Sequence, residues 1–271
     1  MERTMELRGG VRLPRLGLGV YRSAPGETTR RAVAEALAAG YRHVDTARIY
    51  GNERDVGEAV RNGPVPRAEV FVTTKLWNAD QGFDEALRAF DASLDTLGLP
   101  YVDLYLIHWP VPGLRLESWR ALERIHQEGR ARAIGVSNYM VTHLEELAAR
   151  ARIMPAVNQI EVSPFFQQRE VRAWCQAHQV AVEAYSPLTK AVRLHDPVFS
   201  ELARRSGRSA AQVMLRWGLQ HAMAVLPKST RPEHIRENAA IFDFVLDDRS
   251  MASLDALEEG LATGWDPRDQ P

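Results

Sequence analysis

The chain has 271 residues, of which 34 are basic and 35 acidic, so its formal net charge at pH 7 is −1. With 45% apolar and 25% charged residues, it has the composition of an ordinary soluble globular protein. The near-neutral charge, without a run of lysines and arginines, argues against nucleic-acid binding through bulk charge.

The first predicted element is a two-strand hairpin over residues 6–13, with its turn at Gly9-Gly10. Short buried strands and amphipathic helices then alternate along the chain. The eight predicted strands cover residues 16–20, 43–45, 70–74, 102–107, 133–136, 156–160, 180–184 and 224–226. The predicted helices cover residues 28–39, 53–61, 84–97, 116–128, 140–150, 168–178, 209–219, 232–240 and 250–259. Gly40 gives a stop signal to the first helix, and Ser209 with Gln212 forms a capping box.

The predicted strands start at a mean spacing of about 30 residues, which is the length of one strand, one helix and two loops. Eight such units predict an α/β fold, a (β/α)8 TIM barrel that forms a single domain over residues 1–271. The hairpin is expected to close the barrel bottom, and cofactor and substrate to bind at the C-terminal face. An open doubly wound sheet is the alternative, but residues 17–22 lack the third glycine of a dinucleotide-binding turn.

Unusual polar residues fall at the C-terminal ends of the predicted strands, where a barrel carries its chemistry. They are Asp45, Tyr50, Lys75, His108, Ser137, Asn138, Gln159, Tyr185, Ser186, Lys228, Ser229 and Thr230. Each alone has a structural explanation, such as a helix cap or a core position. Several ionisable groups at one barrel mouth instead indicate an active site, because burying unpaired charge is costly.

The types of residue suggest a mechanism. A lysine ammonium beside a tyrosine hydroxyl is expected to lower the tyrosine pKa from about 10, so Tyr50 is the candidate general acid. Asp45 is expected to keep Lys75 charged, and His108 to orient a substrate oxygen. Such a group of residues protonates an alkoxide but supplies no electrons, so a reduction requires a hydride donor. We predict no metal, since none of the eight histidines lies in a ligand cluster, and no Gly-x-Ser-x-Gly of a serine hydrolase occurs.

The chain resembles the aldo-keto reductases, and the resemblance runs in order over nearly its whole length. It is greatest to the short bacterial branch with the 2,5-diketo-D-gluconate reductases and the methylglyoxal or aldehyde reductases. The matching segments are Gly40-Tyr41-Arg42-His43-Val44-Asp45-Thr46-Ala47, Tyr50-Gly51-Asn52-Glu53, Thr73-Thr74-Lys75-Leu76-Trp77, Asp103-Leu104-Tyr105-Leu106-Ile107-His108-Trp109-Pro110, Gly135-Val136-Ser137-Asn138, Pro155-Ala156-Val157-Asn158-Gln159-Ile160-Glu161, Ser186-Pro187-Leu188 and Pro227-Lys228-Ser229.

The resemblance implies a barrel that transfers hydride from NADPH to a carbonyl without a metal. Its catalytic tetrad falls on Asp45, Tyr50, Lys75 and His108. The implied cofactor contacts are Ser137, Asn138 and Gln159 at the carboxamide, Tyr185 at the nicotinamide ring, Lys228, Ser229 and Thr230 at the 2′-phosphate, and also Ser186, Leu188, Arg231, His234, Glu237 and Asn238. The expected substrate contacts are Tyr21, Trp77, His108 and Trp109.

The sequence departs from the family pattern at three places. His234 stands where an arginine usually pairs with the 2′-phosphate, so we expect weaker preference for NADPH and some use of NADH. Ser163 replaces a common histidine, and Arg48 replaces a small residue, either facing anionic substrates or lying solvated in its loop. The tail after Gly260 is short, so we expect an open pocket.

The sequence therefore predicts an NAD(P)H-dependent oxidoreductase that reduces small aldehydes, ketoaldehydes or keto-sugars. The alternative is a cofactor-binding barrel that acts as a redox sensor or structural partner with little turnover. We expect a monomer that binds a small carbonyl substrate, and no nucleic-acid or membrane partner. Without a signal segment or a run of about 18 apolar residues, we expect it in the cytoplasm. The single Cys175 excludes an internal disulfide and is expected to be a buried packing thiol.

Overall fold

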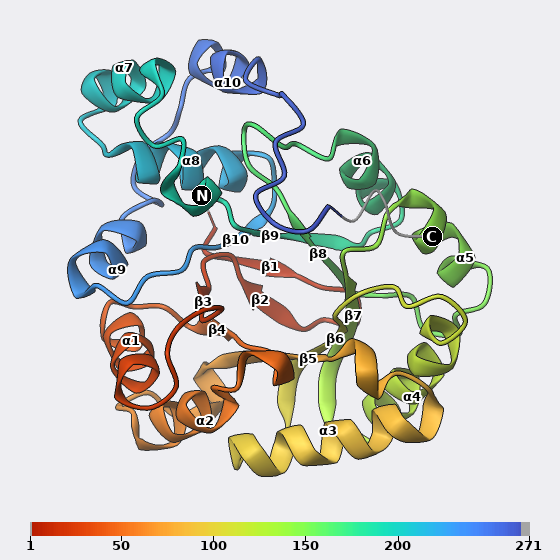
Figure 1. The fold of residues 1–271 in the computed structure, drawn as a ribbon. Helices are drawn as coiled ribbons and strands as arrows, with labels where there is room; N and C mark the ends of the chain where they lie inside the picture. Colours follow the sequence, from red (N-terminus) through yellow and green to blue (C-terminus); the bar gives the residue numbers. More distant parts are fainter. Residues whose placement is uncertain (1, 267–271) are drawn as a thin grey trace.

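The computed structural model describes residues 2–266 and contains a ring of parallel strands surrounded by helices (Figure 1). The eight strands lie in chain order around the ring and each pairs in parallel with the next. They are β3 (Leu18–Gly19), β4 (His43–Asp45), β5 (Phe71–Leu76), β6 (Val102–Ile107), β7 (Ala131–Ser137), β8 (Val157–Glu161), β9 (Ala181–Tyr185) and β10 (Ala224–Leu226). This arrangement confirms the predicted (β/α)8 barrel.

The ring closes between its first and last strands through a short parallel contact. Leu16 bridges to Val225, and the Gly17 N–H donates to the Val225 oxygen at 3.0 Å. A Cβ atom on Gly17 would lie 2.5 Å from Leu226 Cδ2, so a larger residue could not approach the last strand this closely. Glycine at this position therefore permits the barrel to close.

Helices cover the outside of the barrel, and nine of those in the described chain match the predictions within a few residues. They are α1 (Glu27–Ala38), α2 (Glu53–Asn62), α3 (Phe83–Leu97), α4 (Arg115–Gln127), α5 (Val141–Ala148), α6 (Arg169–Ala177), α8 (Ala210–Gln220), α9 (Pro232–Ala239) and α10 (Asp248–Asp255). The predicted capping box is present, since Ser209 Oγ accepts from the Gln212 N–H at 3.2 Å.

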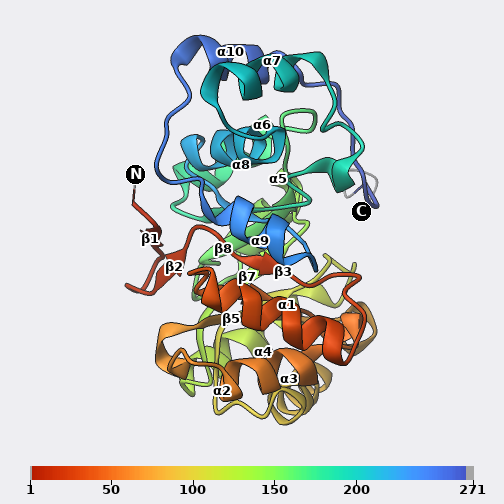
Figure 2. The ribbon, with the colours of Figure 1, turned by 90° about the vertical axis from the view of Figure 1, so that its left-hand side faces the viewer.

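The helix α7 (Pro197–Ser206) was not predicted. Its start signals were nevertheless in the sequence, because Asp196 caps the helix by accepting from the Val198 N–H and Pro197 occupies the first turn. Figures 1 and 2 show α7 beside α10, outside the ring of helices that touches the strands. A helix that adds a second outer layer breaks the regular spacing of strand and helix on which the prediction depended.

The hairpin lies at the N-terminal end of the barrel, as predicted. The strands β1 (Thr4–Glu6) and β2 (Arg12–Pro14) pair in antiparallel register, with Met5 opposite Leu13. The turn between them uses Gly9 and Gly10 at positive φ, +88° and +79°. In the side view of Figure 2 the hairpin covers one end of the barrel, while the C-terminal part of the described chain reaches the other. The second end is therefore the one available for a ligand.

Cys175 is fully buried on α6, as expected of a packing thiol, and burial raises its pKa to about 12. It is the one cysteine of the chain and stays unpaired. Within residues 2–266 no helix combines the length and apolar character needed to cross a membrane.

Candidate active site

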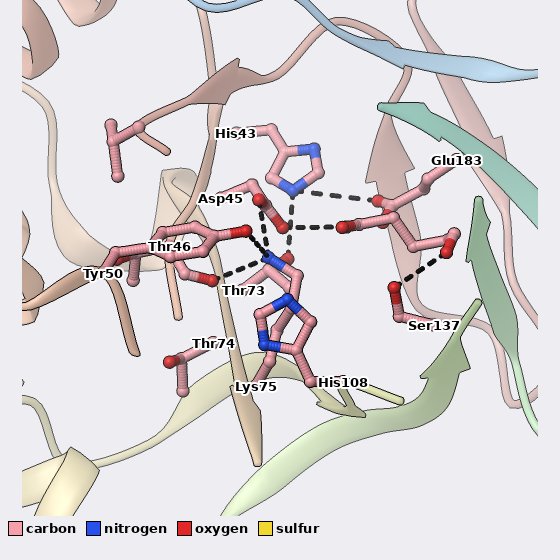
Figure 3. Close-up of polar contacts among 12 residues, drawn as sticks. His43, Asp45, Thr46, Tyr50, Thr73, Thr74, Lys75, His108, Ser137 and Glu183 are labelled. Atoms are coloured by element: carbon pink, nitrogen blue, oxygen red, sulfur yellow. Dashed lines mark hydrogen bonds and ion pairs between the residues drawn. The ribbon is translucent and has the colours of Figure 1, made fainter. Parts of the chain in front are cut away.

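Four side chains meet at the C-terminal mouth of the barrel: Asp45, Tyr50, Lys75 and His108 (Figure 3). Lys75 Nζ donates to Asp45 Oδ1 at 2.7 Å and lies 3.5 Å from the Tyr50 hydroxyl oxygen. The Tyr50 ring packs edge-on against the His108 imidazole, with ring centroids 5.8 Å apart. The structure therefore brings the whole predicted tetrad into one cluster.

Neighbouring strands place these residues. Asp45 ends β4, Lys75 lies near the end of β5, and His108 follows β6 directly. Tyr50 ends a single 3-10 turn, η1 (Arg48–Tyr50), which is closed by Gly51 at φ +69°. Because parallel strands deliver their carboxyl ends to the same side, residues far apart in sequence meet here without a special loop.

Burial sets the charge state of the two groups expected to contact a substrate. It raises the Tyr50 pKa well above its ordinary value, with Asp45 and Tyr21 adding to the effect. The net lowering expected from Lys75 is therefore wrong, because burial dominates and the ammonium also donates to Asp45 and to the Thr46 carbonyl oxygen 2.8 Å away. Burial, reinforced by Lys75, lowers the His108 pKa well below its ordinary value. Tyr50 is thus a protonated phenol and His108 a neutral imidazole at neutral pH.

The predicted carboxamide-binding residues form a second polar cluster beside the tetrad. Asn138 Nδ2 donates to the His108 carbonyl oxygen at 3.0 Å and to Ser137 Oγ at 3.1 Å. Tyr185 donates its hydroxyl hydrogen to Asn138 Oδ1 at 2.8 Å. Gln159 Nε2 donates to Asp45 Oδ2 at 2.8 Å, which joins this cluster to the tetrad. Asn138 adopts φ +63°, a conformation that asparagine tolerates better than most residues.

The other predicted cofactor residues lie away from the tetrad, on two connections. Ser186 and Leu188 follow β9, where Ser186 has φ +48° and accepts the Thr189 N–H at 2.9 Å. The rest lie between β10 and the end of α9: Lys228, Ser229, Thr230, Arg231, His234, Glu237 and Asn238. Within this group the two cations and His234 are exposed, whereas Asn238 is buried.

Aromatic side chains line the mouth near the tetrad. Trp77 packs edge-on against His108 with centroids 5.4 Å apart, and Tyr21 packs against Tyr50 at 5.0 Å. Trp109 lines a cavity of about 410 Å³ together with Trp265, whose ring lies 4.5 Å from it. The short tail therefore reaches the rim of the mouth, which makes this side less open than expected. Sequence reasoning missed Trp265, although an isolated tryptophan in a polar tail was a usable signal.

A buried carboxylate holds the tail in this position. Glu161, at the end of β8, accepts hydrogen bonds from the Thr263 N–H at 2.8 Å and the Gly264 N–H at 3.2 Å, and also from the Thr263 hydroxyl. The glutamate is 1% exposed, so its charge is satisfied by these tail groups. The tail is thus attached to the barrel directly beside the predicted cofactor residues.

The two departures near the pocket have structural partners. The Arg48 guanidinium forms an ion pair with Asp80, with 2.9 Å between Nε and Oδ2, which joins η1 to η3 (Asn78–Asp80). Ser163 is buried in a tight turn, where its N–H and carbonyl oxygen exchange hydrogen bonds with Phe166. The Arg48 ion pair therefore joins two turns beside the tetrad, whereas the bonds of Ser163 to Phe166 are made by its backbone.

Sequence reasoning also missed a polar layer directly beneath the tetrad, formed by His43, Thr73 and Glu183 (Figure 3). His43 Nε2 lies 3.0 Å from Thr73 Oγ1 and 3.8 Å from Glu183 Oε1. All three side chains are completely buried. The signal was a glutamate within a strand predicted to be buried on both faces.

Known proteins resemble this chain over nearly its full length. The sequence profile of the Aldo/keto reductase family matches residues 15–259. A morphine 6-dehydrogenase of Pseudomonas putida is 49% identical over 98% of this chain and 94% of its own. A glyoxal reductase of Bacillus subtilis strain 168 is 45% identical over 97% and 96%. The crystal structure of a Gox0644 mutant in complex with NADPH is 40% identical, covers 100% of this chain and 99% of its own, and has a TM-score of 0.94.

Proposed function

Because this chain belongs to the aldo/keto reductase family, we propose that it reduces small aldehydes, ketoaldehydes or keto-sugars to alcohols, with Tyr50 as the proton donor. Family membership makes the protein an NAD(P)H-dependent oxidoreductase. The observation that carries the proposal is the Lys75 ammonium, which binds Asp45 at 2.7 Å and lies beside a protonated Tyr50 hydroxyl.

The residues at the mouth fit NADPH. No described residue donates a hydrogen bond to Gln159 Oε1, which leaves this atom available to a carboxamide N–H. Lys228 and Arg231 are exposed, and neither forms an ion pair with an acidic residue of the described chain, as a site for a phosphate requires. When bound, NADPH supplies the hydride that adds to the carbonyl carbon.

The chain's own residues then supply the proton and the orientation. The carbonyl oxygen becomes an alkoxide as its carbon gains hydride, and this alkoxide is far more basic than a phenolate. Tyr50 can therefore donate its proton even though its pKa is raised. His108 is neutral and can donate an N–H to the same oxygen, while Lys75 stabilises the phenolate that remains. The product is an alcohol, and solvent returns the proton to Tyr50.

The surroundings favour small substrates of mixed polarity. Tyr21, Trp77 and Trp109 offer apolar ring faces, and Trp265 narrows the side next to Trp109. Since one chain contributes every group of the tetrad, we also propose that a monomer is active. Sedimentation at the concentration used for kinetics tests this, and activity that appears only in an oligomer contradicts it.

The Tyr50→Phe variant tests the function. We expect it to lose reduction of methylglyoxal by at least about 100-fold while it binds NADPH as the wild type does, because only the proton-donating hydroxyl is removed and the ring is kept. Oxidation of NADPH is followed by absorbance, and NADPH binding by quenching of protein fluorescence. The matched control is Tyr101→Phe, which changes a tyrosine at the opposite end of the barrel, packed under Arg67.

Three outcomes contradict parts of the proposal. Retained activity in Tyr50→Phe would remove Tyr50 as the donor. Binding of NADPH by the wild type without turnover on any aldehyde would favour the redox-sensing or structural alternative. Absence of NADPH binding would contradict the assigned cofactor.

A further inference from the structure

Glu183 lies beneath the tetrad in the barrel interior, and the proposed reaction gives it no role. It comes from β9, is 0% exposed, and its carboxyl group faces Asp45 and His43 across the barrel (Figure 3). A glutamate so deeply buried costs free energy unless it is partnered. Its carboxyl group is therefore expected to have a hydrogen-bond partner.

The only hydrogen bond that Glu183 forms through its side chain, within the described residues, goes to Gln159. Gln159 Nε2 donates to Glu183 Oε2 at 2.9 Å and to Asp45 Oδ2 at 2.8 Å. An amide nitrogen carries two hydrogens, so both are used by two carboxyl groups. Rotation of the amide by 180° would instead turn its oxygen toward the Asp45 carboxylate, which is repulsive. The amide is therefore fixed with its oxygen pointing away from both acids.

We propose that Glu183 is a positioning residue which, together with Asp45, fixes the Gln159 amide so that Oε1 is presented to the nicotinamide carboxamide. This inference rests on the proposed function, because it assumes that Gln159 binds that group. Asp45 alone supplies one acceptor and already binds Lys75. Glu183 supplies the second acceptor and thereby removes the remaining freedom of the amide.

The charge of Glu183 depends on groups from several elements. Its strand neighbour β8 contributes the uncharged Gln159, and β10 contributes only apolar residues. Across the barrel it faces His43 and Asp45 from β4 and Lys75 from β5. Burial, and next the Asp45 charge, raise its pKa to about 8, while burial lowers the His43 pKa to about 4. Glu183 is thus mostly protonated at neutral pH and ionises in mild alkali.

Ionisation changes which form of the cofactor the site favours. A second carboxylate beneath Gln159 places negative charge near the nicotinamide ring, which is positive only in the oxidised form. The affinity for NADP+ relative to NADPH should therefore increase as the pH rises through about 8. A glutamate that stayed in one protonation state would produce no such pH dependence.

Two variants and a control test the inference by cofactor binding, measured by quenching of protein fluorescence between about pH 6.5 and pH 9.5. Glu183→Leu removes the acceptor and should weaken NADPH binding about tenfold. Glu183→Gln keeps an acceptor oxygen and should bind NADPH within about twofold of the wild type. The control Glu123→Gln changes another buried glutamate, which accepts two backbone N–H groups outside the barrel, and should behave like the wild type.

The pH series separates the electrostatic effect from positioning. In the wild type and in Glu123→Gln, the ratio of the NADP+ to the NADPH dissociation constant should fall several-fold above about pH 8, whereas in Glu183→Gln it should stay constant. Wild-type binding by Glu183→Leu, or the same pH dependence in Glu183→Gln as in the wild type, would overturn the inference. If circular dichroism shows that Glu183→Leu is unfolded, Glu183→Ala, which likewise lacks the acceptor, replaces it in the NADPH binding measurement. Failure of the wild type to bind NADPH would instead overturn the proposed function.

Discussion

The two ends of the barrel each bury an aspartate against cations. The two clusters differ in the side chains that lie beside the ion pair. At the N-terminal end, Asp103 is bound by Arg67 at 2.7 Å, by Arg132 at 2.9 Å and by the Val72 N–H at 2.9 Å. At the C-terminal mouth, Asp45 is bound by Lys75 and Gln159. Both carboxylates are well paired, so the presence of a buried ion pair does not distinguish a reactive end from a structural one.

The neighbours of the ion pair make the difference. Around Asp103, Arg132 is 46% exposed, whereas Arg67 is 17% exposed and its buried Nε has no hydrogen-bond partner among the described residues. Around Asp45 the cation lies beside the Tyr50 hydroxyl, which donates to no described residue, and the Tyr50 ring packs against the His108 imidazole. A hydroxyl with a spare donor at a barrel mouth is available to a substrate. Buried charge therefore indicates function here where a proton-donating hydroxyl lies beside it at the barrel mouth.

The largest expected effect is a loss of catalysis at the C-terminal mouth of the barrel. Lys75→Met keeps the length of the side chain but removes the ammonium that stabilises a Tyr50 phenolate. We expect kcat for methylglyoxal to fall about 100- to 10,000-fold. Steady-state kinetics measures this, and a change below about tenfold would show that Lys75 serves only the fold.

The equivalent change at the other end should affect stability instead. Asp103→Asn weakens two ion pairs and should lower the free energy of unfolding by about 2–4 kcal/mol, with kcat within about twofold of the wild type. Urea unfolding and kinetics on the same preparation check both halves of this prediction. A large loss of kcat in the folded variant would contradict the separation of the two ends.

The buried pair Glu183 and His43, beneath the mouth, is expected to make the stability of the protein depend on pH. Glu183 and His43 have raised and lowered pKa values of about 8 and about 4, so the folded protein has a proton on the acid and none on the imidazole. Above about pH 6.5 the unfolded chain holds neither proton, so this pair alone lowers stability by up to about 1.4 kcal/mol per pH unit until about pH 8. Between about pH 4.5 and 6.5 both states hold one proton, and the pair has no net effect.

Urea unfolding of the cofactor-free protein at several pH values checks this effect. Glu183→Gln should remove the decline between about pH 6.5 and 8, so its stability relative to the wild type should increase over that range. Parallel curves for the two proteins would mean that Glu183 is ionised throughout.

The smallest expected effect concerns the exposed phosphate-binding residues. His234→Arg adds a permanent charge near Lys228 and Arg231 and should improve NADPH affinity about 2- to 5-fold, with NADH affinity unchanged. Binding and kinetics with both cofactors test it. A wild-type preference for NADPH of several hundredfold across pH 6–8 would show that His234 already serves as well as arginine.

The sequence by itself determined the barrel and the tetrad. The regular spacing of strands and helices predicts eight βα units, and polar residues at strand ends predict which side chains meet, because parallel strands bring those ends to one face. The helix α7 was missed since it interrupts that spacing, even though Asp196 and Pro197 mark its start. Local patterns were sufficient to identify the functional residues that the strand order places at one end of the barrel.

Only the tertiary structure decided the charge states and the contacts across the barrel. Sequence alone indicated that Lys75 would lower the Tyr50 pKa, but the ammonium is directed at Asp45 and burial dominates. The partnership of Glu183 with Gln159 and the position of Trp265 against Trp109 likewise depend on distances between separate elements. A pKa depends on desolvation and on the nearest charges in space, and neither quantity is encoded in the local pattern around one residue.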